Sequence, residues 1–186
     1  MGSTFSLLYI RSDVLLQSEH KCLVNGAECI ESKYVRYDVA VSSDTSTDRD
    51  KNYSLLHNHN TNWLQLFSEN ETDEPIVSSD DIIAISMRFS ATVLTFSVFD
   101  SDIITASLYN PNTLSLETHE LSCYGQSDVY IEPDDYGVPE FLLEICDADK
   151  RNDLSAIWYS NKYIFAEDKL QDLCNLLGLR TYPYNT

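Results

Sequence analysis

Closely spaced carboxylates are the residues of this sequence with the plainest capacity for chemistry. Asp80 and Asp81 are adjacent, and Asp100 and Asp102 are separated by one residue. General acid–base catalysis requires two carboxyl groups at a set separation in a pocket that moves their pKa values apart. Acids in turns usually point into water instead, and Asp100 and Asp102 flank a predicted hairpin turn. We therefore predict turn hydrogen bonds for Asp100 and Asp102 and no catalytic residue.

A metal site is the second chemistry that the sequence offers. His57 and His59 form an H-x-H pair, but they lie in the polar, Asn-rich stretch "LLHNHNTNW", which is predicted as a loop. The segment "DADKRNDLSAIW" begins with the alternating acids of a calcium loop. Arg151 then occupies the third ligand position, and Trp158 occupies the place of the bidentate glutamate. We predict no metal ligand and no cofactor.

Motifs that hold phosphates or activate nucleophiles are missing from the sequence. It contains no G-x-S-x-G elbow, Walker A loop, Rossmann glycine fingerprint or H-E-x-x-H motif. Its five glycines leave little material for phosphate-binding loops. A binding protein is therefore favoured over an enzyme. A small hydrolase or metal-dependent enzyme that uses scattered acids is kept as an alternative.

The distribution of charge is the most informative property of the sequence. The formal net charge is −18, and between Lys51 and Lys150 there are eighteen acids and a single basic residue, Arg88. Nucleic-acid affinity is built from Lys and Arg contacts to phosphates, so direct nucleic-acid binding is disfavoured. A negative field speeds encounter with cationic partners. Acidic composition also serves solubility alone, which is the alternative to a specific basic partner.

Strands are expected to supply most of the framework that positions these residues. Apolar or alternating segments rich in β-branched and aromatic residues predict strands. They lie at Thr4–Ile10, Lys33–Val41 and Asn62–Asn70, with an antiparallel three-stranded meander over Thr92–Leu121. The turns of the meander are predicted at "DSD" and "NPN".

Three helices are predicted from apolar spacing and end signals. Ser78–Ala91 begins with a Ser N-cap candidate and two Asp residues, which the helix dipole favours in the first turn. Val138–Cys146 has a proline at its start, and Ala166–Gly178 has the clearest apolar stripe, with glycine at the C′ position. Between the last two helices, Ala156–Asp168 is predicted as a short strand or turn.

Length and element order define the expected fold. The 186 residues match a single domain spanning residues 1–186. The order of elements predicts the α+β class, with an antiparallel sheet that includes a central three-stranded meander and with helices packed on one face. Five scattered cysteines predict reduced thiols, of which Cys174 is the clearest buried one. We recognise neither a secretory signal nor a membrane span and predict a cytoplasmic protein without membrane contact.

Three segments carry a resemblance to a known group of proteins. They are "WLQLF", the meander "VLTFSVFDSDIITASLYN" and the acidic "YIEPDDYGVPEFLLEI". Set in a small acidic α+β domain rich in Tyr, Ser and Asn, they resemble the immunity proteins of bacterial polymorphic toxins and contact-dependent growth inhibition systems. The resemblance is one of overall character, because these immunity families share no common signature.

The resemblance implies that the protein binds and neutralises a toxin. Immunity proteins occlude a cognate toxin domain, and many of those toxins are nucleases with basic surfaces that hold phosphates. The implied partner is therefore a basic protein, a toxin nuclease domain, whose Lys and Arg residues meet carboxylates of this chain. The contacts predicted under this hypothesis are Asp134, Asp135, Tyr136, Glu140 and Glu144, followed by Glu132 and Tyr130. An acidic DNA mimic, or another protein-binding regulator, is the alternative binding function.

Overall fold

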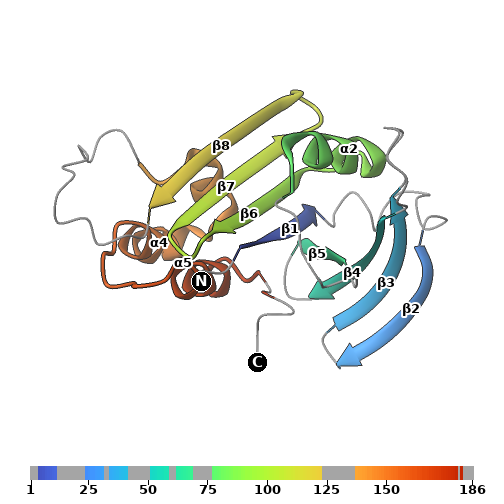
Figure 1. Cartoon of the computed structure of the whole chain (residues 1–186), viewed down its shortest axis with the longest axis horizontal. Coiled ribbons are helices and arrows are strands. Elements are labelled where there is room, and N and C mark those ends of the chain that lie inside the picture. The colour runs from blue at the N-terminus through green and yellow to red at the C-terminus, as the bar shows by residue number, and fades with distance from the viewer. Residues whose placement is uncertain are drawn as a thin grey trace.

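An eight-stranded antiparallel sheet is the framework of the protein (Figure 1). The computed structural model describes residues 4–11, 24–31, 34–41, 51–58, 62–68, 77–122, 137–179 and 181. Neighbouring strands are antiparallel throughout, which confirms the predicted sheet type. In spatial order the strands are β2 (Val24–Glu31), β3 (Tyr34–Val41), β4 (Lys51–Asn58), β5 (Trp63–Ser68), β1 (Phe5–Arg11), β6 (Val93–Phe99), β7 (Ile103–Asn110) and β8 (Ser115–Ser122).

The first strand of the chain, β1, lies inside the sheet between β5 and β6. Its side chains alternate between two separate cores. Phe5, Leu7 and Tyr9 belong to one core, whereas Leu8 and Ile10 belong to the other. Because both faces of the strand are buried, its sequence is an almost continuous apolar run rather than a polar–apolar alternation.

Three helices cover one face of the sheet: α3 (Glu140–Ile145), α4 (Arg151–Trp158) and α5 (Ala166–Leu176). The predicted stripe of α5 is confirmed, since Leu173 and Cys174 are buried. Gly178 follows α5 with a φ of 68°, the left-handed conformation that a C′ glycine adopts without steric cost. The core under these helices contains Leu142, Leu154, Trp158, Leu170 and Leu173 from the helices and Phe5, Leu7, Phe96 and Ile104 from the strands.

Among the described helices, α2 (Ser79–Phe89) packs instead in the second core, through Ile82, Ile85 and Phe89. Its predicted N-cap is confirmed. Ser78 Oγ accepts a hydrogen bond from the Asp81 N–H at 3.1 Å, and the Asp81 carboxylate accepts one from the Ser78 N–H at 3.2 Å. This reciprocal pair is a capping box, which fixes the start of the helix.

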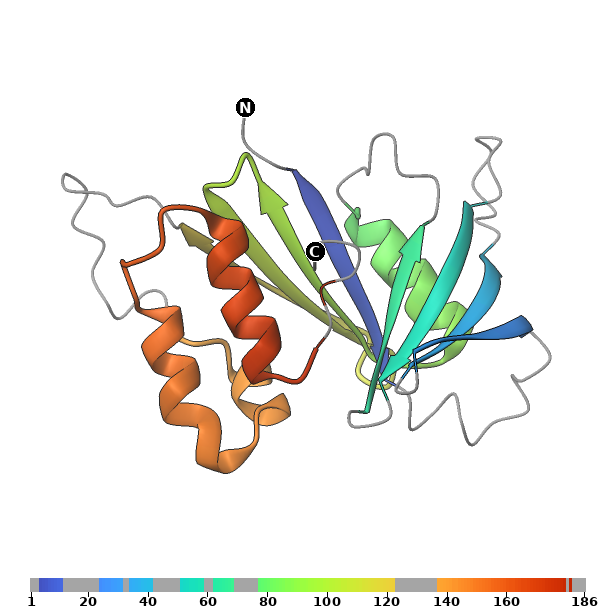
Figure 2. The same cartoon turned by 90° about the horizontal axis from the view of Figure 1, so that it is seen from below.

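The α+β class and the central meander are confirmed, but the expectation that the helices pack on one face needs correction. Figure 2 shows α2 on one side of β1 and β6, with α4 and α5 on the other side. The reason is that β1 and β6 are apolar on both faces, so each face needs its own cover. Apolar spacing shows that a helix has a buried side, and it does not show which face of the sheet that side meets.

A two-residue turn joins β6 to β7 at the predicted position. Asp100 and Ser101 have φ values of 50° and 62°, and the Asp102 N–H donates to the Phe99 carbonyl at 3.1 Å. Positive φ at both central residues is the type I′ geometry, whose twist matches that of the flanking strands. The turn therefore orients the hairpin for the rest of the meander.

Two predicted segments differ from the structure. Trp158 lies at the end of α4, not in a short strand or turn, because Leu154 and Trp158 are one helical turn apart and are both buried. His57 lies on β4 instead of in a loop, and β4 pairs with both β3 and β5. The two neighbouring strands supply hydrogen-bond partners for the backbone N–H and C=O groups of β4. A polar sequence does not by itself indicate such pairing. His59 lies outside the described residues.

Candidate functional site

The predicted partner contacts that the structure describes lie on α3. Glu140 and Glu144 are both exposed, and their spacing of four residues places them on one side of the helix. Phe141 and Leu142 bury other sides of the same helix in the core. The structure therefore brings two predicted contacts together at the surface. The remaining predicted contacts lie outside the described residues: Tyr130, Glu132, Asp134, Asp135 and Tyr136.

Further exposed carboxylates follow α3 along the chain. Asp147, Asp149 and Asp153 are exposed. Asp149 lies in the 3-10 turn (Ala148–Lys150), Asp147 immediately precedes that turn, and Asp153 lies in the first turn of α4. Together with the two glutamates of α3 they form what is called the acidic helical surface below. Its members are Glu140, Glu144, Asp147, Asp149 and Asp153.

One lysine partly neutralises this surface. Lys150 Nζ lies 2.7 Å from Asp147 Oδ2, and the hydrogen bond to Asp147 raises the pKa of the lysine, which keeps it protonated. Both side chains are well exposed, and an exposed ion pair contributes little to stability. Asp147 is therefore a less available contact for an incoming cation than Glu140 or Glu144.

A hollow of about 280 Å³ adjoins the acidic helical surface. The Arg11 guanidinium lies 6.0 Å from the ring centroid of Trp63, within the range of a cation–π contact. Two positive side chains, Arg11 and Lys150, and two negative ones, Glu144 and Asp147, line the hollow, so their formal charges cancel. A hollow with balanced charge and several polar groups is suited to the recognition of polar groups. Its lining consists of Arg11, Asn62, Trp63, Glu144, Ile145, Asp147, Lys150, Leu177 and Gly178.

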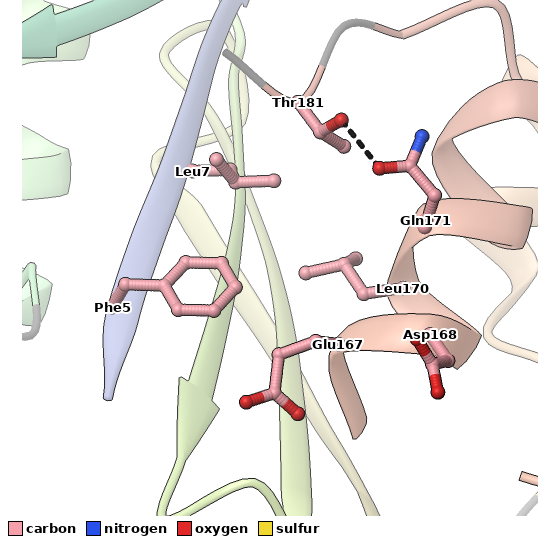
Figure 3. Close-up of a pocket in the computed structure, with 7 residues that line it drawn as sticks. All are labelled: Phe5, Leu7, Glu167, Asp168, Leu170, Gln171 and Thr181. Atoms are coloured by element: carbon pink, nitrogen blue, oxygen red, sulfur yellow. Dashed lines mark hydrogen bonds between the residues drawn. The ribbon is translucent and has the colours of Figure 1, made fainter. Parts of the chain in front are cut away.

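A second hollow of about 280 Å³, called the β1–α5 pocket below, lies between β1 and α5. Figure 3 shows Phe5 and Leu7 extending from β1 toward Leu170, with the Glu167 carboxylate at one end. The sequence does not indicate this pocket, because its walls come from distant parts of the chain. The one feature of the pocket that the sequence shows is the pair of acids at the start of the last predicted helix. Acids are expected there in any case, because the helix dipole favours negative charge in the first turn. Its lining consists of Phe5, Leu7, Glu167, Asp168, Leu170, Gln171 and Thr181.

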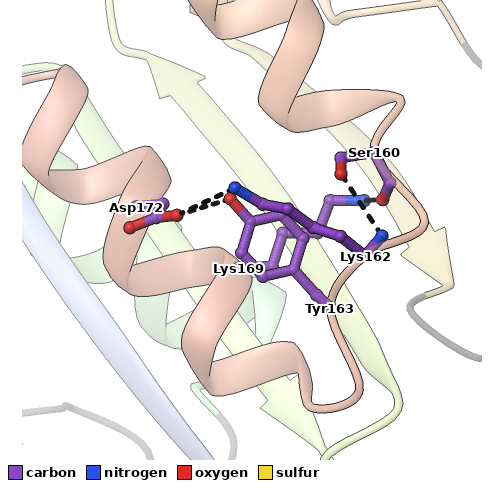
Figure 4. Close-up of polar contacts among 5 residues, drawn as sticks. All are labelled: Ser160, Lys162, Tyr163, Lys169 and Asp172. Atoms are coloured by element: carbon purple, nitrogen blue, oxygen red, sulfur yellow. Dashed lines mark hydrogen bonds and ion pairs between the residues drawn. The ribbon is translucent and has the colours of Figure 1, made fainter.

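A polar cluster fixes the connection between α4 and α5 (Figure 4). Lys169 is only 2% exposed, and its ammonium donates to the Ser160 carbonyl at 3.0 Å. The Tyr163 hydroxyl donates to Asp172 Oδ2 at 2.5 Å, and Lys162 Nζ lies 3.8 Å from the same oxygen. Burial, followed by the hydrogen bond to Asp172, raises the pKa of Tyr163, so the phenol remains a donor at neutral pH. These contacts hold a loop against a helix and are structural.

Burial makes Cys146 and Cys174 poor nucleophiles. Cys174 is fully buried, and burial raises its pKa to about 12, so the reactive thiolate is absent at neutral pH. Its Sγ lies 3.7 Å from the Tyr9 hydroxyl. Cys146 is also buried and free, and its pKa is raised chiefly by burial. The predicted reduced, buried state of Cys174 is confirmed.

In the part of the chain that the structure describes, no group of three or more His, Cys, Asp or Glu side chains could hold a metal ion. The His119 ring packs against Phe141, with centroids 5.8 Å apart, which is a packing contact. Within the same residues, no helix is both long and apolar enough to cross a membrane.

Comparison with known proteins adds no identity to this geometry. No protein-family model, curated protein or solved structure matches the chain.

Proposed function

We propose that the protein is a cytoplasmic immunity protein, which binds and neutralises a cognate toxin by occluding its active site. The proposed partner is a basic protein, a toxin nuclease domain in a bacterial growth-inhibition system. The observation that carries the proposal is the one-sided charge: eighteen acids and one arginine between Lys51 and Lys150. The exposed glutamates of α3 and the acids that follow them support the same conclusion.

The proposed mechanism separates association from retention. Carboxylates of the acidic helical surface, with Asp134 and Asp135 of the preceding segment, attract the lysines and arginines with which a nuclease holds phosphates. This attraction raises the association rate and weakens as salt screens it. Apolar and tyrosine contacts, for which Tyr130 and Tyr136 are the candidates, then set the dissociation rate.

The first experiment is capture of the partner from the native organism. Tagged protein is incubated with nuclease-treated lysate at low salt and then washed at high salt. Retention of one basic protein in equimolar amount, together with inhibition of that protein's activity on titration, is the expected result. Capture of many basic proteins that all elute at high salt would assign the charge to solubility and would overturn the proposal.

A growth assay distinguishes an immunity protein from another binding protein. Expression of the captured partner alone is expected to arrest growth, and co-expression of this chain is expected to restore it. A captured partner that is harmless when expressed alone, or that is not inhibited by the chain, would contradict the immunity function.

A further inference from the structure

The strand β8 forms an outer edge of the eight-stranded sheet (Figure 1). It pairs with β7 in a continuous antiparallel register that runs from Ile103↔Ser122 to Asn110↔Ser115. Among the described residues, its backbone makes no hydrogen bond to a segment other than β7. Alternate backbone groups of an edge strand point away from the sheet, so β8 presents a row of N–H and C=O groups to a further strand.

The middle of β8 is open on both faces of the sheet. Residues 117–120 are all exposed. Successive side chains of a strand point to opposite faces, so exposure of four in a row means that neither face is covered there. On either side of this stretch, Leu116 packs against the core of α2 and Leu121 against the core of the other helices. Packing therefore holds β8 as a strand while its edge stays accessible.

The opposite edge of the sheet, β2, is less regular. Its register with β3 shifts between Asn25 and Ala27 and again between Cys29 and Glu31. Such irregularities twist an edge strand and hinder the pairing of a further strand. The register of β8 has no shift, and its sequence SLETHELS has neither proline nor lysine, which proteins also use to protect edges. Of the two edges, β8 is therefore the better template for strand pairing.

Charge determines which strand this edge accepts. Glu117 and Glu120 are exposed on opposite faces of β8. Glu117 shares its face with His119, whose ring packs against Phe141 of α3, so the exposed Glu140 of that helix adds negative charge nearby. A second copy of this chain would bring the same acids and a net charge of −18, and repulsion would oppose its pairing. A segment with Lys or Arg opposite the two acids is attracted on both faces.

We propose that the β8 edge binds an extended basic segment of a protein partner as a further antiparallel strand, with Lys or Arg side chains opposite Glu117 and Glu120. Main-chain hydrogen bonds supply the affinity, and the paired side chains set the register. Directly opposite residues share a face of the sheet, so the two basic residues lie three positions apart in the partner. The proposal goes beyond the immunity function, because it holds for any protein that presents such a segment.

The test uses the full chain and two matched peptides, both acetylated and amidated. Val-Thr-Lys-Val-Thr-Lys-Val-Thr can place its lysines opposite Glu117 and Glu120, and the second peptide has glutamate at both lysine positions. Each is titrated into isotopically labelled protein while the backbone amide signals of β8 are followed by NMR. Saturable shifts with a Kd in the millimolar range or tighter are expected for the lysine peptide, and affinity at least about tenfold weaker for the glutamate peptide. No saturable shift in β8, or equal affinity for the two peptides, would overturn the proposal.

Methylation of the peptide backbone separates strand pairing from simple attraction between charges. The N–H groups of alternate residues in a paired strand point to the same neighbour. Two forms of the lysine peptide are therefore compared, each N-methylated at one of the two alternate sets of residues. One form should bind at least about tenfold more weakly than the other, because only one set donates to β8. Equal affinities of the two forms would assign binding to charge alone and would refute strand pairing.

Hydrogen exchange tests the partner against a second copy of the chain. The β8 amides that point away from β7 should exchange rapidly in the free protein, at rates that do not depend on protein concentration. Saturation with the lysine peptide should slow their exchange. Unchanged exchange on saturation would contradict strand pairing. Exchange that slows as the protein alone is concentrated, at low or high salt, would assign the edge to a second copy and would contradict the proposed partner.

Variants of the protein locate the charge that the peptide meets. The Glu117→Gln, Glu120→Gln double variant keeps the strand and is expected to bind the lysine peptide about tenfold more weakly. The matched control is Asp149→Asn, Asp153→Asn, which removes the same charge from the α4 region and is expected to leave the Kd within about twofold. Equal losses in the two double variants would assign binding to overall charge and would refute the pairing of basic residues with Glu117 and Glu120.

Discussion

The Ser101 hydroxyl donates a hydrogen bond of 2.5 Å to the Glu167 carboxylate and so joins the β6–β7 turn to the first turn of α5. Ser101 is 6% exposed and has a φ of 62°, at a turn position that usually holds glycine. The left-handed conformation costs a serine energy that glycine does not pay. The contact with Glu167, together with the Ala166 N–H to Ser101 carbonyl bond, offsets that cost.

Removal of this hydroxyl should destabilise the protein. In Ser101→Ala the strained backbone is kept and the hydrogen bond to a charged acceptor is lost, so the free energy of unfolding is expected to fall by about 1–3 kcal/mol. Ser101→Gly loses the same bond but relieves the strain, so a smaller fall is expected. Urea denaturation measures both. Ser155→Ala, at a half-buried helical site where the hydroxyl only donates back to the Arg151 carbonyl, is the control and should change stability by no more than about 0.5 kcal/mol. A Ser101→Ala variant as stable as this control would contradict the structural role.

Charge reversal on α3 should slow association with the partner. Glu140→Lys combined with Glu144→Lys is expected to lower the association rate constant by about tenfold or more at low salt and to reduce its salt dependence, because electrostatic steering acts mainly on association. The matched control is Asp80→Lys with Asp168→Lys, which reverses two exposed charges in the first turns of α2 and α5. Surface plasmon resonance with the captured partner at several salt concentrations gives the rates. Equal effects of the two double variants would remove α3 from the interface.

Stability at alkaline pH should depend on Cys174. Its pKa is about 12 in the folded protein and 9.0 for a free thiol, so the unfolded chain releases the thiol proton first. The stabilisation is complete below pH 9 and is lost as the pH rises through about 12, by on the order of 4 kcal/mol in total. Cys174→Ala should show a shallower fall in the free energy of unfolding over this window. Denaturant titrations under reducing conditions at intervals from pH 8 upward measure the slopes, and parallel slopes for the two proteins would contradict the prediction.

A substitution in the β7–β8 turn should stabilise the protein. Leu114 has a φ of 54° and is 69% exposed, so it combines backbone strain with little burial. Asparagine tolerates the left-handed region, and Leu114→Asn is expected to raise the free energy of unfolding by up to about 1 kcal/mol. Leu114→Val is the control with the opposite sign, because a β-branched residue is more strained there. Thermal unfolding should rank asparagine above leucine and leucine above valine, and any other order would contradict the strain.

The sequence by itself determined the elements whose signals are local. The meander over Thr92–Leu121, the capping of α2 and the apolar stripe of α5 depend on residues a few positions apart, and all three were predicted. The buried state of Cys174 followed from the same stripe. The exposure of Glu140 and Glu144 agrees with acids on the polar side of a short amphipathic helix.

Only the tertiary structure decided which distant segments meet. The assignment of α2 to the face opposite α5 depends on neighbours far along the chain, and β4 is defined by its pairing with the strands on either side of it. Ser101 and Glu167 are 66 residues apart, and the β1–α5 pocket joins Phe5 to Thr181. Periodicity reports that a residue is buried, whereas packing geometry selects the partner that buries it, and that choice is made only when the whole chain folds.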